Sequence, residues 1–180
     1  MTTQRFVRSA RSEDIDEIVE AQVASWRDAY REAFPPAVLS EMTGEEAGGR
    51  FRERWREAVE HPPTPRHRLL VATDEGRVAG FTAFGPAGDP DLWPRTDAEL
   101  YALHVHPRLI GRGHGSRMLN AAVDYLLDDG FGVVHLWVLR EGDPLRSFAE
   151  AAGWRPDGAR RELDLGAAVP MIRLRAAIGG

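Results

Sequence analysis

Apolar positions in the first third of the chain follow the period of an α-helix. The residues that share this face are Ile15, Ile18, Val19, Val23 and Trp26. Ser12-Glu13-Asp14 precedes them and places capping and acidic side chains at the positive end of a helix dipole. We therefore predict a helix from Ser12 to the neighbourhood of Tyr30.

The period of the pattern changes after Arg68. Two apolar runs, 69–72 and 78–84, flank the turn residues 74–76 and predict a β-hairpin. The other expected elements are strands at 6–9, 100–105, 133–139, 162–165 and 171–174, and helices at 37–42, 45–59, 114–127 and 144–152.

This order of elements predicts a mixed α/β sheet. The unit from residue 99 to residue 139 reads strand, helix, strand, which favours a right-handed parallel crossover. A chain of 180 residues is long enough for one domain and short for two, and neither an internal repeat nor a linker is evident. We expect a single domain over 1–180.

Composition narrows the classes of function. The chain has no cysteine, which excludes disulfides, cysteine nucleophiles and cysteine-based zinc sites. Neither a signal peptide nor an apolar stretch of about 18 residues is visible, so we expect a cytoplasmic protein with no membrane partner. The net charge of −5 argues against a nucleic-acid partner. Arg108, Arg112 and Arg117 nevertheless form a local basic spot.

Three alternate glycines, Gly111, Gly113 and Gly115, lie within this basic spot, between a predicted strand and a predicted helix. Glycines allow successive backbone N–H groups to converge, and a helix start adds unpaired donors and partial positive charge. The arrangement suits a diphosphate. A plain tight turn is the alternative interpretation.

The spacing of the loop disfavours two common phosphate-binding motifs. The nucleotide-hydrolase loop needs a lysine before its Ser or Thr, and Gly115-Ser116 has none. A dinucleotide fingerprint needs its third glycine three residues after the second, whereas Gly115 follows Gly113 by two.

The loop resembles the signature of the GCN5-related N-acetyltransferase (GNAT) family, which reads Gln or Arg, two residues, Gly, one residue, then Gly or Ala. Gly113 and Gly115 take its glycine positions, and Ile110 stands where Gln or Arg is usual. Element order and the segments ELYALHVHP (99–107), LWVL (136–139) and FAEAAGW (148–154) extend the resemblance. It implies the GNAT fold, a mixed sheet of about seven strands splayed between the fourth and fifth and flanked by helices.

The resemblance also implies an activity and a cosubstrate, acetyl-coenzyme A (acetyl-CoA). The acetyl group would pass to a primary amine of a small molecule, peptide or protein by direct attack in a ternary complex. Backbone groups of Leu103 and Val105 would hold the pantetheine and thioester. The expected cofactor-binding residues are Leu103, His104, Val105, Arg108, Gly111, Arg112, Gly113, His114, Gly115 and Ser116. A homodimer is left open.

Catalysis of this kind needs a base, because an alkyl ammonium must lose a proton before its nitrogen can attack. Glu99 stands eleven residues ahead of Ile110, where one branch of the family places its catalytic glutamate, and we expect burial to raise its pKa. A surface carboxylate is the alternative. Ala149 replaces the tyrosine that usually acts as acid, and Tyr101 is a weak substitute.

Aromatic and histidine side chains give two further candidates. Trp26 and Tyr30 share a helix face and are expected to shape the acceptor site, with simple core packing as the alternative. His104, His106 and His114 are close in sequence, but no Cys or carboxylate completes a ligand set, so we expect no metal.

The missing tyrosine and the Ile110 position keep a second function open, a non-catalytic domain that binds or senses acyl-CoA. A nucleotide-binding module that uses the same loop is a third candidate.

Overall fold

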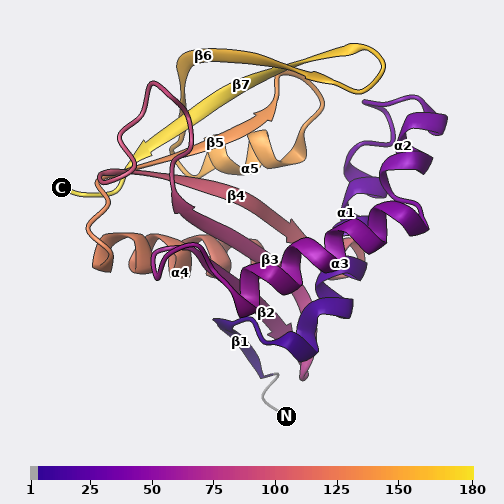
Figure 1. Ribbon diagram of the computed structural model, residues 1–180, viewed down its shortest axis with the longest axis horizontal. Helices are drawn as coiled ribbons and strands as arrows, with labels where there is room; N and C mark the ends of the chain where they lie inside the picture. Colours follow the sequence, from indigo (N-terminus) through magenta and orange to yellow (C-terminus); the bar gives the residue numbers. More distant parts are fainter. Residues whose placement is uncertain (1–3) are drawn as a thin grey trace.

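The computed structural model describes residues 4–180 and is built on a seven-stranded mixed sheet (Figure 1). The strands are β1 (Arg5–Ser9), β2 (Arg68–Asp74), β3 (Arg77–Pro86), β4 (Asp97–Val105), β5 (Val133–Leu139), β6 (Arg155–Asp164) and β7 (Ala168–Ala177). Their order in the sheet is β1-β2-β3-β4-β5-β7-β6, and β4 and β5 form the parallel pair. The predicted α/β class and the parallel crossover are confirmed.

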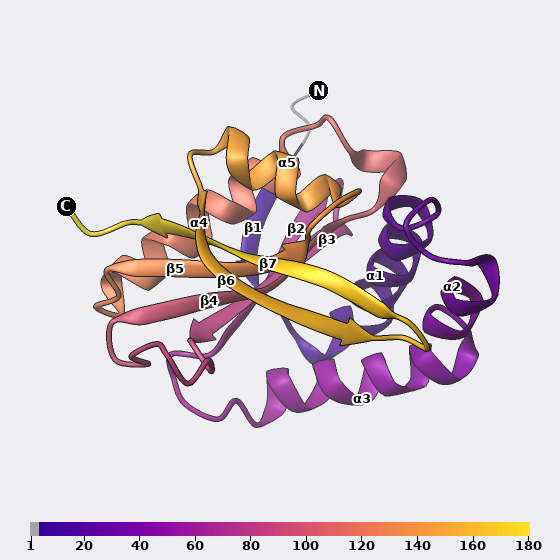
Figure 2. The ribbon, with the colours of Figure 1, turned by 90° about the horizontal axis from the view of Figure 1, so that it is seen from above.

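Five α-helices flank the sheet, with α4 and α5 on one side and α3 on the other (Figure 2). They are α1 (Ile15–Ala29), α2 (Pro36–Met42), α3 (Glu45–Glu60), α4 (His114–Asp128) and α5 (Pro144–Ala151), with short 3₁₀ turns η1 (Ser12–Asp14) and η2 (Pro107–Leu109). Within residues 4–180, none of these helices has the length and apolarity needed to cross a membrane.

Helix α1 begins slightly later than predicted, because Ser12–Asp14 forms the 3₁₀ turn η1 and the α-helix starts at Ile15. The Asp14 carboxylate accepts hydrogen bonds from the Arg11 N–H at 2.8 Å and from the Arg8 guanidinium at 2.7 Å. These bonds satisfy donors at the start of the helix and tie it to β1.

The two faces of the sheet bury separate apolar clusters, which follows from the alternation of side chains along each strand. On β2, Leu69 and Val71 face the cluster that contains Trp55 of α3. Leu70 faces the other cluster, which includes Met118 of α4. Because both faces are covered by helices, the central strands read as nearly continuous apolar runs.

Strands β4 and β5 separate soon after they begin. Their pairing joins Asp97–Glu99 to Val133–His135 and then stops, so the rest of β4 is unpaired on that side. The expected splay between the fourth and fifth strands is confirmed. On its other side β4 continues to pair with β3, with a bulge at Tyr101 that shifts the register.

Strand β6 is much longer than predicted. The sequence predicted residues 162–165, whereas the strand spans Arg155–Asp164 and pairs with β7 on both sides of an irregularity between Pro156 and Arg160. It forms an edge of the sheet, and nearly all of its side chains are exposed. A polar edge strand has no hydrophobic alternation to reveal it.

Candidate active site

A cavity of about 380 Å³ lies beside the second half of β4 and is called the loop cavity here. Its walls come from α1, β4, the glycine loop that precedes α4, and α5. Of the predicted cofactor-binding residues, the structure brings these to its walls: Leu103, His104, Val105, Gly111, Gly113, His114, Gly115 and Ser116. The predicted loop and strand therefore line one shared space.

The glycine loop adopts a backbone that other residues would resist. Gly111 and Gly113 have φ of +81° and +82°, in the left-handed region. Gly113 is the residue that caps α4, and it supplies no side chain to pair with the first N–H groups of the helix. These groups remain available to an anion, as a diphosphate site requires.

A buried histidine supports the loop from behind. His114 is 1% exposed, and its Nε2 lies 3.0 Å from an Asp74 carboxylate oxygen of β2. Its Nδ1 lies 3.1 Å from the Arg117 guanidinium, which is a donor, so Nδ1 accepts and Nε2–H donates to Asp74. Burial lowers the pKa of His114 and keeps the ring neutral. The Arg117 guanidinium also donates to the Arg112 carbonyl.

Two predicted residues lie elsewhere. The side chains of Arg108 and Arg112 line a separate cavity of about 340 Å³. Arg108 is exposed, and Arg112 reaches the Asp74 carboxylate at 3.5 Å. The structure therefore does not bring either guanidinium to the loop cavity.

A second cavity, of about 190 Å³, lies at the opening between β4 and β5 and is called the splay cavity. Trp26, Tyr30, Glu99 and Tyr101 contribute to its walls together with residues from the β6–β7 hairpin. In Figures 1 and 2 the tip of this hairpin lies on the same side of the molecule as α1 and α2. The hairpin and the early helices thus enclose the opening.

The loop cavity and the splay cavity meet. The residues that line both are Tyr30, His104, Asp143 and Leu145. Trp26 and Tyr30 pack edge to face with ring centroids 6.1 Å apart, so the predicted pair lies at this junction.

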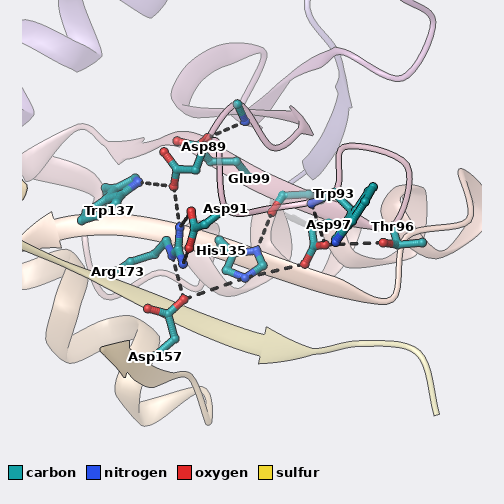
Figure 3. A network of polar contacts seen from close by, with 12 residues as sticks. Asp89, Asp91, Trp93, Thr96, Asp97, Glu99, His135, Trp137, Asp157 and Arg173 are labelled. Atoms are coloured by element: carbon teal, nitrogen blue, oxygen red, sulfur yellow. Dashed lines mark hydrogen bonds and ion pairs between the residues drawn. The ribbon is translucent and has the colours of Figure 1, made fainter. Parts of the chain in front are cut away.

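Glu99 is the last residue of β4 that pairs with β5, and it lines the splay cavity. Its side chain is half-buried, and one carboxylate oxygen lies 3.5 Å from the Gly88 N–H (Figure 3). Burial raises the pKa of Glu99, and the neighbouring Asp89 carboxylate adds to the rise. A carboxylate of raised pKa is a better proton acceptor than an ordinary surface glutamate.

The loop that contacts Glu99 is held by a buried arginine, as Figure 3 shows. Arg173 of β7 is 4% exposed and donates to Asp89 and Asp91 of the loop, at 2.8 and 2.6 Å, and to Asp157 of β6 at 2.7 Å. The Trp137 indole N–H also donates to Asp89. The loop is thereby fixed to β5, β6 and β7.

Neither position considered for the general acid offers a free hydroxyl group. The Tyr101 hydroxyl donates to the Pro86 carbonyl, and burial raises the pKa of this phenol. Ala149 is 2% exposed and packs in the core, while Phe148 beside it lines the loop cavity. The structure shows no tyrosine hydroxyl on α5 that could replace the missing one.

His104 forms a hydrogen-bonded chain at the junction of the cavities. The Trp26 indole N–H donates to its Nε2 at 3.3 Å, and Ser25 Oγ lies 3.2 Å from its Nδ1. Because an indole N–H can only donate, we assign the hydrogen of the ring to Nδ1. Burial lowers the pKa of His104 to about 4, so the ring is neutral near pH 7.

The three histidines considered as metal ligands have different partners. His104 binds Trp26, His106 accepts from the Arg108 N–H, and His114 binds Asp74. No group of three or more histidine or acidic side chains within residues 4–180 is arranged to hold a metal ion.

Sequence reasoning missed one residue of the junction, Asp143, and one beside it, Ser25. The Asp143 carboxylate caps α5 and accepts from the N–H groups of Leu139 and Leu145. Burial raises its pKa. Asp143-Pro144 is a recognisable helix start, which could have signalled the cap. Ser25 gives no such signal, because its role depends on a contact with β4 that is 79 residues away.

Comparison with known proteins agrees with this geometry. Residues 23–154 match the acetyltransferase (GNAT) family. The uncharacterized N-acetyltransferase YuaI of Bacillus subtilis is 32% identical over 136 residues, which are 75% of this chain and 72% of YuaI.

Two solved structures share the fold. The PaiA N-acetyltransferase from Thermoplasma acidophilum, in complex with coenzyme A, matches with a TM-score of 0.75 and 18% identity over 97% of this chain and 99% of that one. The yncA acetyltransferase from Salmonella typhimurium, with its cofactor acetyl-CoA, gives a TM-score of 0.66 and 17% identity over 98% of this chain and 95% of that one. On the match over residues 23–154 and the identity with YuaI, the chain belongs to the acetyltransferase (GNAT) family.

Proposed function

We propose that this protein transfers the acetyl group of acetyl-CoA to a primary amine of a small molecule, peptide or protein. The loop cavity holds the cosubstrate, and the splay cavity holds the acceptor. The observation that carries the proposal is the junction of the two cavities, with Glu99 lining only the splay cavity.

The residues of the loop cavity fit a coenzyme A molecule. The left-handed glycines and the start of α4 present N–H groups suited to the diphosphate. The unpaired side of β4 beyond Glu99 offers backbone groups to the amides of a pantetheine arm. Gly113 of the loop and Val105 of β4 both line the cavity. When bound there, acetyl-CoA supplies an activated acetyl thioester.

Glu99 takes the proton that an amine must lose before it attacks. The ammonium group enters the splay cavity, whose walls combine aromatic rings with the Glu99 carboxylate. The carboxylate accepts the proton directly or through water, and the freed nitrogen attacks the thioester carbonyl at the junction. The N–H of Val105 is suited to stabilise the oxyanion.

Release of thiol from acetyl-CoA in the presence of a panel of amines tests the proposal. We expect turnover with at least one amine, and Glu99→Gln should lower kcat by roughly 100-fold or more with little change in affinity for coenzyme A. Glu162→Gln, which alters an exposed carboxylate on edge strand β6, is the matched control and should leave kcat unchanged. Equal turnover by wild type and Glu99→Gln would remove Glu99 from the mechanism.

The buried Ala149 favours one alternative, a domain that binds acyl-CoA without catalysis. That function predicts tight binding of acetyl-CoA and no thiol release with any amine of the panel. Tighter binding of ATP or NAD than of coenzyme A would favour a nucleotide-binding module instead.

A further inference from the structure

The family's usual hydroxyl donor is absent from α5, so the departing sulfur needs a different partner. The walls of the loop cavity include no arginine or lysine side chain among the described residues. The carboxyl groups of Asp28 and Asp143 line it, and both oppose a negative charge on sulfur. His114 lines it as a neutral ring with both nitrogens already bonded. A thiolate there depends on neutral hydrogen-bond donors.

Ser25 of α1 is such a donor, and the hydrogen bonds around it leave its hydrogen unused. The hydrogen bonds run from the Trp26 indole to His104 Nε2, and from His104 Nδ1 to Ser25 Oγ. Ser25 Oγ therefore accepts, and its own hydrogen is free. The structure gives this oxygen no other hydrogen-bond partner among residues 4–180. Donors aligned in one chain polarise one another and strengthen the last bond.

Ser25 lies beside the junction of the two cavities. The side chain lines the loop cavity and not the splay cavity, so it lies on the cosubstrate side. It is 3.2 Å from His104, which lines both cavities. The hydroxyl is thus next to the junction.

We propose that the Ser25 hydroxyl, oriented by His104 and Trp26, donates a hydrogen bond to the sulfur of coenzyme A as the thiolate departs. This inference rests on the proposed function. The amine nitrogen forms a bond to the carbonyl carbon, the carbon–sulfur bond breaks, and its electron pair stays on sulfur. The protons lost by nitrogen go to Glu99 and then to sulfur or water. Ser25 keeps its own proton throughout.

Tyr30 is the competing donor, because it lines both cavities. Burial, with a contribution from the Asp143 carboxylate, raises the pKa of its phenol, so the hydroxyl keeps its proton. Its hydroxyl has no hydrogen-bond partner among the described residues that would fix its direction. Tyr30→Phe is therefore the comparison variant for Ser25→Ala in the binding experiment, where it should leave the pH dependence of coenzyme A affinity as in the wild type.

The sharpest test needs no acceptor and no turnover. A free thiol has a pKa near 8.5. If Ser25 stabilises the bound thiolate, the affinity for coenzyme A rises as pH increases toward about 8.5 and then levels off. Ser25→Ala should weaken this rise and shift the pKa of the bound thiol upward by about one unit or more. Ser25→Thr keeps the hydroxyl and should restore the rise.

Further variants and a second ligand complete the experiment. Acetyl-CoA has no free thiol, so its affinity should show no such rise in wild type or in Ser25→Ala. Trp26→Phe frees His104 to place its hydrogen on Nε2, which lets Nδ1 accept from Ser25, and the rise should shrink. In turnover, Ser25→Ala should lower kcat roughly 10- to 100-fold near pH 7, with a smaller defect above pH 9.

Two results would overturn the inference. One is an unchanged pH dependence of coenzyme A affinity in Ser25→Ala. The other is a loss of this pH dependence in Tyr30→Phe that Ser25→Ala does not share. Failure of the proposed function gives a different result. The wild type would then release no thiol from acetyl-CoA with any amine, whatever the pH dependence of coenzyme A binding.

Discussion

At the scale of single residues, the chemistry of the junction depends on which protons are held and which are free. His104 is neutral because burial lowers its pKa to about 4, and this neutrality lets its two nitrogens act differently, one accepting and one donating. Glu99, a few residues earlier on β4, has a raised pKa for the same physical reason. Burial thus disfavours the charged form of both groups.

The depressed pKa of His104 makes stability depend on pH. Between pH 6.5 and 4 the unfolded chain binds a proton at His104 that the folded chain does not, so the free energy of unfolding falls as pH falls. At pH 4 this contribution amounts to about 3 kcal/mol. Urea unfolding of wild type and His104→Gln at several pH values checks it. The variant should lose less stability on acidification. Equal losses in the free energy of unfolding for the two proteins would contradict the expectation.

The raised pKa of Glu99 has a kinetic consequence. The carboxylate must be ionised to accept a proton, so kcat/KM for the amine should fall as pH drops through the Glu99 pKa, which lies above the usual 4.5. A pH profile of thiol release between pH 4.5 and 7 measures this limb. Glu99→Gln should abolish this fall in kcat/KM at low pH. A fall that persists unchanged in the variant belongs to another titrating group.

The sequence predicted the parts of the candidate site that depend only on neighbouring residues. The glycine loop lies in one short segment, and its spacing between a strand and a helix is visible in the sequence. Arg108 and Arg112 were grouped with the glycines by proximity along the chain, but their side chains leave the loop on the side away from the cavity. The contact of Ser25 with His104 joins distant segments, and periodicity does not carry such information.

At the scale of elements, the glycine loop, α4 and β2 form one unit. Arg117, one turn into α4, approaches Gly113, and a Cβ at that glycine would lie 2.9 Å from Arg117 Nη1. The same guanidinium bonds His114 and the Arg112 carbonyl. The shape of the loop is therefore fixed by the helix that follows it and by Asp74 of β2.

Gly113→Ala tests this unit. An alanine at φ +82° costs about 1–2 kcal/mol of backbone strain, and its Cβ would displace Arg117. We expect the Kd for coenzyme A, measured by calorimetry, to rise roughly tenfold. Gly49→Ala is the control, because a Cβ there meets open space on α3. It should leave the Kd unchanged and raise stability by about 0.5–1 kcal/mol.

The elements themselves were predicted to different degrees. Helix α4 was predicted almost to its final residue, since its apolar stripe packs against the sheet. Strand β6 was largely missed, because an exposed edge strand carries polar residues on both faces. The early residues of β4 were missed because Asp97 and Glu99 interrupt the apolar run.

At the scale of the whole molecule, Arg173 joins the two halves of the sheet. It connects the loop between β3 and β4 with β6, across the line where β4 and β5 separate. The guanidinium holds the pKa of Asp91 at about 2. A charge at 4% exposure is tolerated because its carboxylate partners surround it.

Removing this cation should destabilise the fold. Arg173→Leu leaves the half-buried carboxylates of Asp89 and Asp157 without their counterion, and we expect a loss of about 1–3 kcal/mol in the free energy of unfolding. The loss should shrink at low pH, where the carboxylates take up protons. Arg160→Leu, at an exposed arginine of β6, should change stability by less than about 0.5 kcal/mol. Similar losses in both variants would show that Arg173 acts only as surface charge.

The early separation of β4 and β5 gives the sheet two edges in its interior. Backbone donors and acceptors along β4 beyond Glu99 are in the position of an uncovered border strand, although helices shield both faces. Any ligand that fills this gap with amide groups of its own completes the hydrogen bonding of the sheet, as an added strand would. The gap between β4 and β5 is therefore suited to ligands that carry amide groups along an extended chain.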